Sequence, residues 1–141
     1  MAGSFTDYAE AKILDFLFKG TGSPWTAPTF YVALFTGTLS GDTPGTEVTG
    51  GSYARKATVA ADWNAAVTNS TNKRVDNANA LGFPAPTADW GGGSPVTHVG
   101  LMDASSGGNA YIYADLATPR TILNGDGAPS FAAGALTFDL G

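Results

Sequence analysis

The sequence has no cysteine, a single histidine and few charges, since Lys, Arg, Asp and Glu together make up 13% of its 141 residues. Without cysteine there is no disulfide framework, no thiolate metal site and no cysteine nucleophile. The charged fraction is about half the usual value, so we expect neighbouring molecules to cover part of the surface. The length suits one domain, and we expect a single structural domain over residues 1–141.

Basic residues are scarce and scattered as well. The formal net charge is −5, and the adjacent cations are limited to the pairs Arg55-Lys56 and Lys73-Arg74. No basic stripe could follow a phosphate backbone, so we expect no direct nucleic-acid binding. No apolar run approaches the ~20 residues of a membrane span, and residues 1–7 lack the basic and apolar regions of a signal peptide. We therefore expect no membrane association, and we expect the protein to be made and assembled in the cytoplasm.

Short runs rich in β-branched and aromatic residues recur along the chain, cut at regular intervals by Gly, Pro, Asn and Asp. The clearest runs are residues 29–36, 96–102, 110–116 and 136–140. This pattern predicts an all-β fold, an antiparallel β-sandwich of the jelly-roll or immunoglobulin-like kind, over residues 29–141. The first run has large apolar residues on both alternating faces, which predicts a central strand buried from both sides.

Three further segments predict less regular strands. Residues 52–60 should form an edge strand, because two adjacent cations on a strand point to opposite faces. Residues 74–83 are rich in Asn and predict an irregular strand in which Asn77 forms a turn or bulge. A short strand over 120–123 should follow the Thr118-Pro119 break.

The first twenty residues are organised differently. Apolar residues recur at helical spacing, and Gly20 can take the left-handed conformation that ends a helix. We expect an amphipathic helix over residues 1–20, with Ser4 or Thr6 as its N-cap. Its apolar face is broad, and it either covers one end of the sheet or packs against a second subunit.

Two loops stand out. Residues 37–51 form a long polar stretch rich in Gly and Thr, which either contacts a partner or is a disordered surface loop. Asp42 and Glu47 are too sparse for a calcium loop, so we expect no metal and no other cofactor.

In the second loop, residues 87–95, three glycines resemble a phosphate-binding loop, but no Lys-Ser/Thr pair and no helix follow them. These glycines should instead let the chain turn tightly beside Trp90.

Catalytic groups are equally sparse. His98 has no Ser or Cys partner at a recognisable spacing, so it should face solvent or be satisfied within the core. Asp89 and Asp103 show no acid/base pairing of the kind that a glycan hydrolase needs. We therefore expect a protein that is not an enzyme and has no catalytic residues.

Five segments follow one another behind the amphipathic helix: 29–36, 50–56, 87–91, 96–104 and 131–136. In this order they resemble small virion proteins of tailed bacteriophages. Such proteins are often labelled tail-fibre proteins, and others of similar build serve as capsid decoration, or cement, proteins. The resemblance implies a structural role in repeated copies and supplies no catalytic residues. The sequence lacks the heptads, collagen-like triplets and β-helical repeats of an extended shaft.

We therefore predict a decoration protein on the outer surface of the phage head, which forms homo-oligomers, a trimer being favoured, and bridges copies of the major capsid protein. The alternative is a tail-fibre or tail-tip module that contacts other tail proteins or a host-surface glycan. Trp25, Trp63 or Trp90 could stack on sugars in that case, unless they anchor loops to the core. The predicted interface residues are Phe5, Tyr8, Phe16, Leu39, Thr43, Val48 and Trp90.

Overall fold

The computed structural model describes residues 3–20, 29–37 and 45–140. Within these ranges the chain has one α-helix, α1 (Asp7–Lys19), and two short 3₁₀ turns, η1 (Ala60–Asp62) and η2 (Trp90–Gly93). The strands in the same ranges are β1 (Gly3–Phe5), β2 (Tyr31–Thr36), β3 (Thr46–Glu47), β4 (Lys56–Ala57), β5 (Val67–Asn69), β6 (Asn72–Asp76), β7 (Leu81–Gly82), β8 (Val96–Met102), β9 (Ala110–Arg120), β10 (Ser130–Phe131) and β11 (Thr137–Leu140). No helix in the described ranges has the length and apolar character to cross a membrane.

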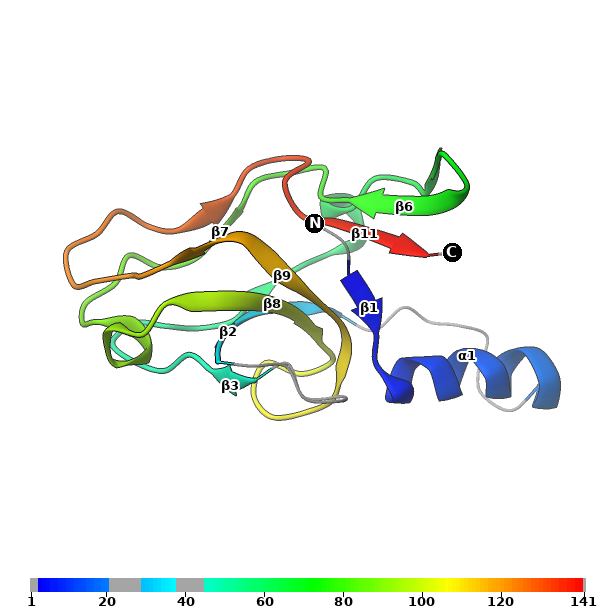
Figure 1. The fold of residues 1–141 in the computed structure, drawn as a ribbon, viewed down its shortest axis with the longest axis horizontal. Coiled ribbons are helices and arrows are strands. Elements are labelled where there is room, and N and C mark those ends of the chain that lie inside the picture. Colours follow the sequence, from blue (N-terminus) through cyan, green and yellow to red (C-terminus); the bar gives the residue numbers. More distant parts are fainter. Residues whose placement is uncertain (1–2, 21–28, 38–44, 141) are drawn as a thin grey trace.

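The strands form an all-β sandwich with antiparallel pairing, as the sequence predicts (Figure 1). The main sheet runs in the order β1-β9-β8-β2-β3, and β4 also pairs with β2. One face of this sheet is covered by two smaller sheets, β11-β6-β5 and β10-β7. The hydrophobic core lies between the main sheet and the smaller ones, with buried residues contributed from both sides.

β2 is buried from both sides, which confirms the sequence prediction for residues 29–36. Val32 and Leu34 point into the core shared with the small sheets. Ala33 and Phe35 lie on the opposite face, where they pack with Met102 and Ala110. A strand with two buried faces needs apolar residues at consecutive positions, and this run supplies them.

Trp90 is the largest fully buried side chain of the core. Its ring lies 5.2 Å from that of Tyr53 and 6.3 Å from that of Phe83, both in edge-to-face arrangements. Its indole nitrogen donates a hydrogen bond to the Gly51 carbonyl at 2.9 Å, and its backbone amide donates to the Ile122 carbonyl at 3.0 Å. Trp90 therefore ties three separate loops to one point of the core.

The three glycines after Trp90 form the tight turn that the sequence predicts. Gly91, Gly92 and Gly93 have φ values of 59°, 63° and 81°. Residues that carry a Cβ rarely adopt this left-handed backbone conformation, whereas glycine adopts it readily. Glycine at these positions therefore lets the chain reverse its direction beside the buried Trp90 indole.

A charged network closes one edge of the main sheet. The Arg55 guanidinium donates to both carboxylate oxygens of Glu47 at 2.7 Å, and to the carbonyls of Ala104 and Gly107 at 2.5 and 2.8 Å. Tyr53 donates to the same carboxylate at 3.1 Å, and burial raises the pKa of its hydroxyl. The network holds β3, the chain before β4 and the β8–β9 hairpin together. Lys56 lies in β4, which pairs with β2, in line with the predicted edge position.

The predicted lengths of two elements are wrong: the helix over residues 1–20 and the strand over residues 52–60. Gly3–Phe5 form strand β1 on β9, so the helix starts at Asp7 rather than spanning residues 1–20. The expected strand over 52–60 contracts to Lys56–Ala57, because a turn at Gly50 and the burial of the Tyr53 ring divert the chain before it.

The break predicted at Thr118-Pro119 is also wrong. β9 continues to Arg120, which pairs with Val96, whereas Asp115 pairs with His98. The four residues between these pairs face one residue of β8, so the strand bulges there. Pro119 lies in this irregular part, where a missing backbone donor costs no ladder hydrogen bond.

Replacing Trp90 by alanine measures how much the stability of the core depends on its indole ring. Trp90→Ala should lower the free energy of unfolding by about 3–5 kcal/mol, because it leaves a cavity and removes the hydrogen bond from the indole to the Gly51 carbonyl. Trp63→Ala should cost less, since Trp63 is only partly buried beside Phe138. Urea unfolding of both variants checks this, and equal losses would contradict a special role for Trp90.

Acid should weaken the junction of β6 and β11. Two hydrogen bonds from Arg74, at 2.7 and 2.8 Å, hold the pKa of Asp139 below its usual value of 3.8. A carboxyl with a lowered folded pKa stabilises above its unfolded pKa, and that contribution is lost as the pH falls through the folded value. The thermal midpoint should therefore drop below about pH 4, and Asp139→Asn should flatten this drop. Asp15→Asn, which removes an exposed pair on α1, should not flatten it.

Candidate interaction surface

The first turn of α1 is firmly docked on β9. The Thr6 hydroxyl accepts a hydrogen bond from the Ala9 amide at 3.3 Å, which makes Thr6 the N-cap, one of the two residues predicted for that role. The same hydroxyl donates to the Ala110 carbonyl at 2.5 Å, and the Thr6 amide donates to the Tyr111 carbonyl at 2.9 Å. Thr6 is 1% exposed. One side chain thus starts the helix and attaches it to the sheet.

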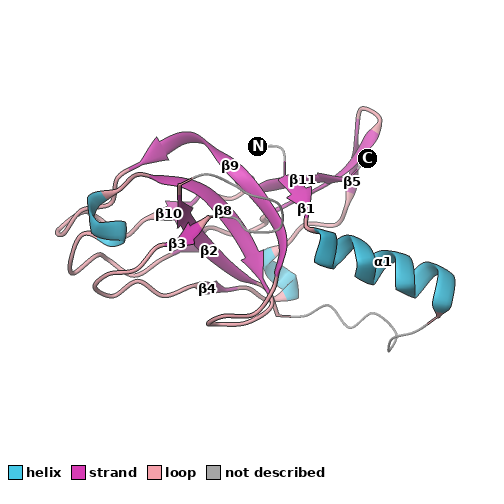
Figure 2. Cartoon of the chain, turned by 60° about the horizontal axis from the view of Figure 1, so that its bottom comes forward, coloured by secondary structure: helices cyan, strands magenta, loops and turns pink. Residues whose placement is uncertain are grey.

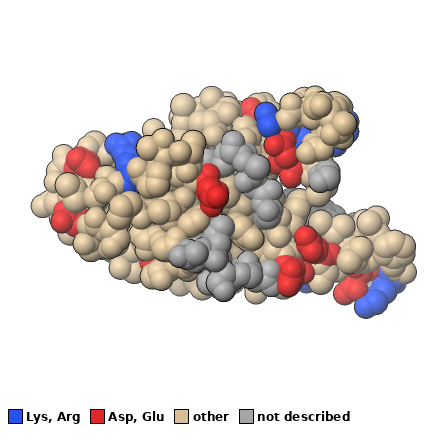
Figure 3. Space-filling view, viewed as in Figure 1, with Lys and Arg blue, Asp and Glu red and all other residues tan. Residues whose placement is uncertain are grey.

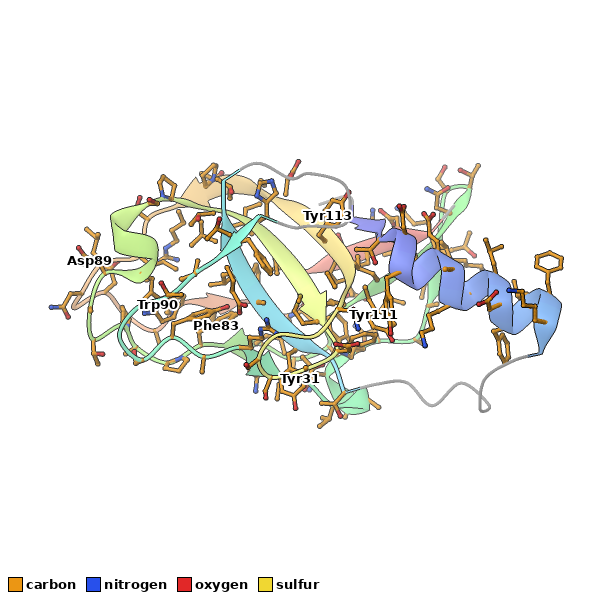
Figure 4. All side chains as sticks on the ribbon, turned by 90° about the horizontal axis from the view of Figure 1, so that it is seen from below. Tyr31, Phe83, Asp89, Trp90, Tyr111 and Tyr113 are labelled. Carbon is orange, nitrogen blue, oxygen red and sulfur yellow. The ribbon has the colours of Figure 1, made fainter. Side chains whose placement is uncertain are left out.

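An aromatic cluster strengthens this attachment. The Tyr111 ring lies 5.3 Å from Tyr8 of α1 and 5.2 Å from Phe30, both edge to face. Burial, together with a hydrogen bond to Tyr8, raises the pKa of Tyr111 to about 12. Figure 4 shows Tyr111 beside the start of α1, away from the end of the sandwich that holds Trp90.

The second half of α1 projects from the sandwich (Figures 1 and 2). Leu14, Leu17 and Phe18 are 54%, 65% and 82% exposed. Their spacing of three and four residues places them on one side of the helix, and we call them the outer stripe. Asp15 and Lys19 pair at 2.7 Å, and Gly20 ends the helix with φ 59°. The alternative in which the whole apolar face covers the sheet is therefore wrong for this half.

The predicted interface residues have different positions in the structure. Tyr8 belongs to the docked turn, Phe5 lies in β1, and Phe16 is 41% exposed on α1. Val48 and Trp90 are 1% and 0% exposed, so their side chains lie in the core of the chain and offer no surface to a partner. Leu39 and Thr43 lie outside the described residues, as does Trp25.

A second apolar surface lies at the end of the sandwich opposite α1. It is a half-open cleft of about 170 Å³, which we call the apolar cleft. Its apolar lining comes from β2, β8, β9, β10 and the loops between the strands: Leu34, Phe83, Val96, Leu116, Ile122 and Phe131. Thr118 and Arg120 of β9 also line it. Sequence reasoning did not find this site, because it is assembled from segments far apart in the chain.

The outer stripe could be anticipated from the sequence. Leu14 and Phe18 widen the apolar face of the helix beyond what one contact with a sheet can bury. On the face shown in Figure 3, charged side chains gather at the end that holds α1 and the β5–β6 hairpin, and the rest of this face carries few charges.

The groups considered for catalysis have structural partners. The Asp89 carboxylate accepts from the Asn124 amide at 2.8 Å, and that of Asp103 accepts from the Asn109 amide at 2.7 Å. His98 is 8% exposed and lies 2.9 Å from an Asp115 oxygen, so it is satisfied within the fold. In the described ranges, every buried side-chain nitrogen or oxygen has a hydrogen-bond partner, and no group of metal-ligating residues is assembled.

The β-sandwich thus presents exposed apolar side chains on α1 at one end and a half-open apolar cleft at the other. The chain belongs to the family of the podophage GP4 fiber I protein gp80, whose family model matches residues 4–139. It is therefore a phage virion structural protein from a family of the fibre type, which confirms the resemblance to tailed-phage virion proteins. A search of curated proteins finds no match.

Removal of the Thr6 hydroxyl should loosen α1. Thr6→Ala should cost about 1–2 kcal/mol of unfolding free energy, because the cap and the bond to β9 are both lost. Amide hydrogen exchange at Ala9 should also become faster. Thr6→Ser keeps the hydroxyl and serves as the control. If both variants behaved alike, the hydroxyl would not be the anchor.

Proposed function

We propose that the protein is a structural subunit of the phage fibre apparatus and attaches to its neighbours through the outer stripe of α1. The observation that carries this proposal is the exposure of Leu14, Leu17 and Phe18 on a helix anchored by its other end. Contiguous exposed apolar side chains on a folded domain mark a contact site. The family match supports a place in a fibre.

The energy of one such contact is modest. Full burial of a Leu or Phe side chain contributes roughly 1.5–3 kcal/mol. Leu14, Leu17 and Phe18 are already partly covered, so burying their exposed parts contributes about 3–6 kcal/mol in total. Association costs at least about 4 kcal/mol of translational and rotational freedom. A single contact is thus weak, and firm attachment requires several copies bound side by side.

Capsid decoration is the second candidate. The observation that favours it is the build of the chain, a sandwich with no shaft-forming repeat in its sequence. A clamp of this shape could bridge major capsid protein subunits, and the outer stripe would then bind the capsid lattice. A glycan-binding role has less support, since Trp90 is fully buried and offers no ring to a sugar.

The copy number per virion separates the two candidates. Quantitative mass spectrometry of purified virions, referenced to the major capsid protein, should find about ten to a few tens of copies for a fibre subunit. Immunogold labelling should then place the protein at the tail. Hundreds of copies on the head would overturn the fibre assignment and support decoration, in which case heads lacking the protein should break at lower temperature and lower salt.

A further inference from the structure

The apolar cleft has the size of one aromatic ring. Its volume is about 170 Å³, and a cavity of roughly 150 Å³ lined by aliphatic and aromatic side chains holds a benzene molecule. Phe83 and Phe131 line it with ring centroids 6.4 Å apart at 64°. An inserted phenyl ring could therefore meet both aromatic neighbours edge to face.

The same chain carries a matching ring on its outer stripe. Phe18 is 82% exposed, the highest value among the large apolar residues of the described chain. It lies in the last turn of α1, next to Leu14 and Leu17 on the same side. The ring is thus presented at a protruding helix end and flanked by two leucines that can cover the rim of a cleft.

The charges at the two surfaces also match. Arg120 lines the cleft and makes no ion pair with another described residue. The C-terminal end of a helix carries a partial negative charge from its free carbonyl groups. Lys19 would oppose the approach of Arg120, but it is already paired with Asp15 within α1. The C-terminal end of α1, which presents Phe18, can therefore lie beside Arg120 without an unpaired positive charge opposing it.

The two surfaces cannot meet within one molecule, because they lie at opposite ends of its long axis (Figures 1 and 4). Phe83, a cleft residue, lies at the end far from α1. We propose that Phe18 of one copy inserts into the apolar cleft of a second copy, which is a head-to-tail contact between identical subunits. This inference rests on the proposed structural role and names the partner of the outer stripe.

When the outer stripe of one copy binds the apolar cleft of another, the resulting dimer still has one free outer stripe and one free cleft. Repetition then yields a closed ring if the rotation between copies closes, and an open filament if it does not. Either outcome supplies the repeated copies that a weak contact requires.

Two surface variants test the contact by complementation. Phe18→Ser removes the ring but keeps the cleft, whereas Thr118→Trp fills the cleft at an exposed position and keeps the ring. Val59→Ser is the control, since Val59 is also an exposed apolar residue, at 65%, but lies outside both surfaces. Sedimentation velocity of the full chain, up to about 1 mM, should show weak, concentration-dependent self-association of the unaltered protein and of the control.

Each single variant should self-associate at least about tenfold more weakly. An equimolar mixture of the two should recover a dimer, because one intact ring and one intact cleft are then present, and the mixture should stop at dimers. Self-association of Thr118→Trp alone would overturn the proposal in favour of a symmetric helix-to-helix contact. An unaltered protein that stays monomeric at 1 mM would overturn it in favour of a different virion protein as the partner, while the copy number per virion would still decide the proposed function.

Discussion

The fold depends on the burial of Trp90 between the main sheet and the loops that close one end of the sandwich. Its indole nitrogen holds the Gly51 carbonyl, its amide holds the Ile122 carbonyl, and its ring packs on Phe83. Three loops that have little regular structure of their own are thus fixed by one residue, through its side chain and its backbone amide. The walls of the apolar cleft include Phe83 and Ile122, so the same interaction that completes the core also shapes a surface.

The two ends of the molecule differ in how completely they bury their apolar residues. At the Trp90 end nearly all large side chains are enclosed, apart from the cleft. At the other end β9 offers room for one turn of α1, which Thr6 and Tyr8 occupy. In the described part of the chain, the second half of the 13-residue helix extends beyond the sheet. The exposed outer stripe is therefore a consequence of where the anchor lies, and it provides the contact on which a structural role in a virion depends.

The sequence predicted the candidate site in part. Helical spacing and the end at Gly20 located α1, and the broad apolar face drew attention to Leu14 and Phe18. Val48 and Trp90 were expected at an interface because they lie in or beside polar, glycine-rich loops, yet both are core residues. Local composition does not show whether a large side chain in a loop points inward, since that depends on a cavity made by distant strands.

The sequence by itself determined the all-β class, the two buried faces of β2, the N-terminal helix and its glycine stop. Each follows from periodicity or from backbone preference within a few neighbouring residues. Only the tertiary structure decided that β9 continues past Pro119, that β1 pairs ahead of the helix, and that residues from distant strands and loops enclose one cleft. These features arise from pairing and packing between segments up to about a hundred residues apart, which no local pattern encodes.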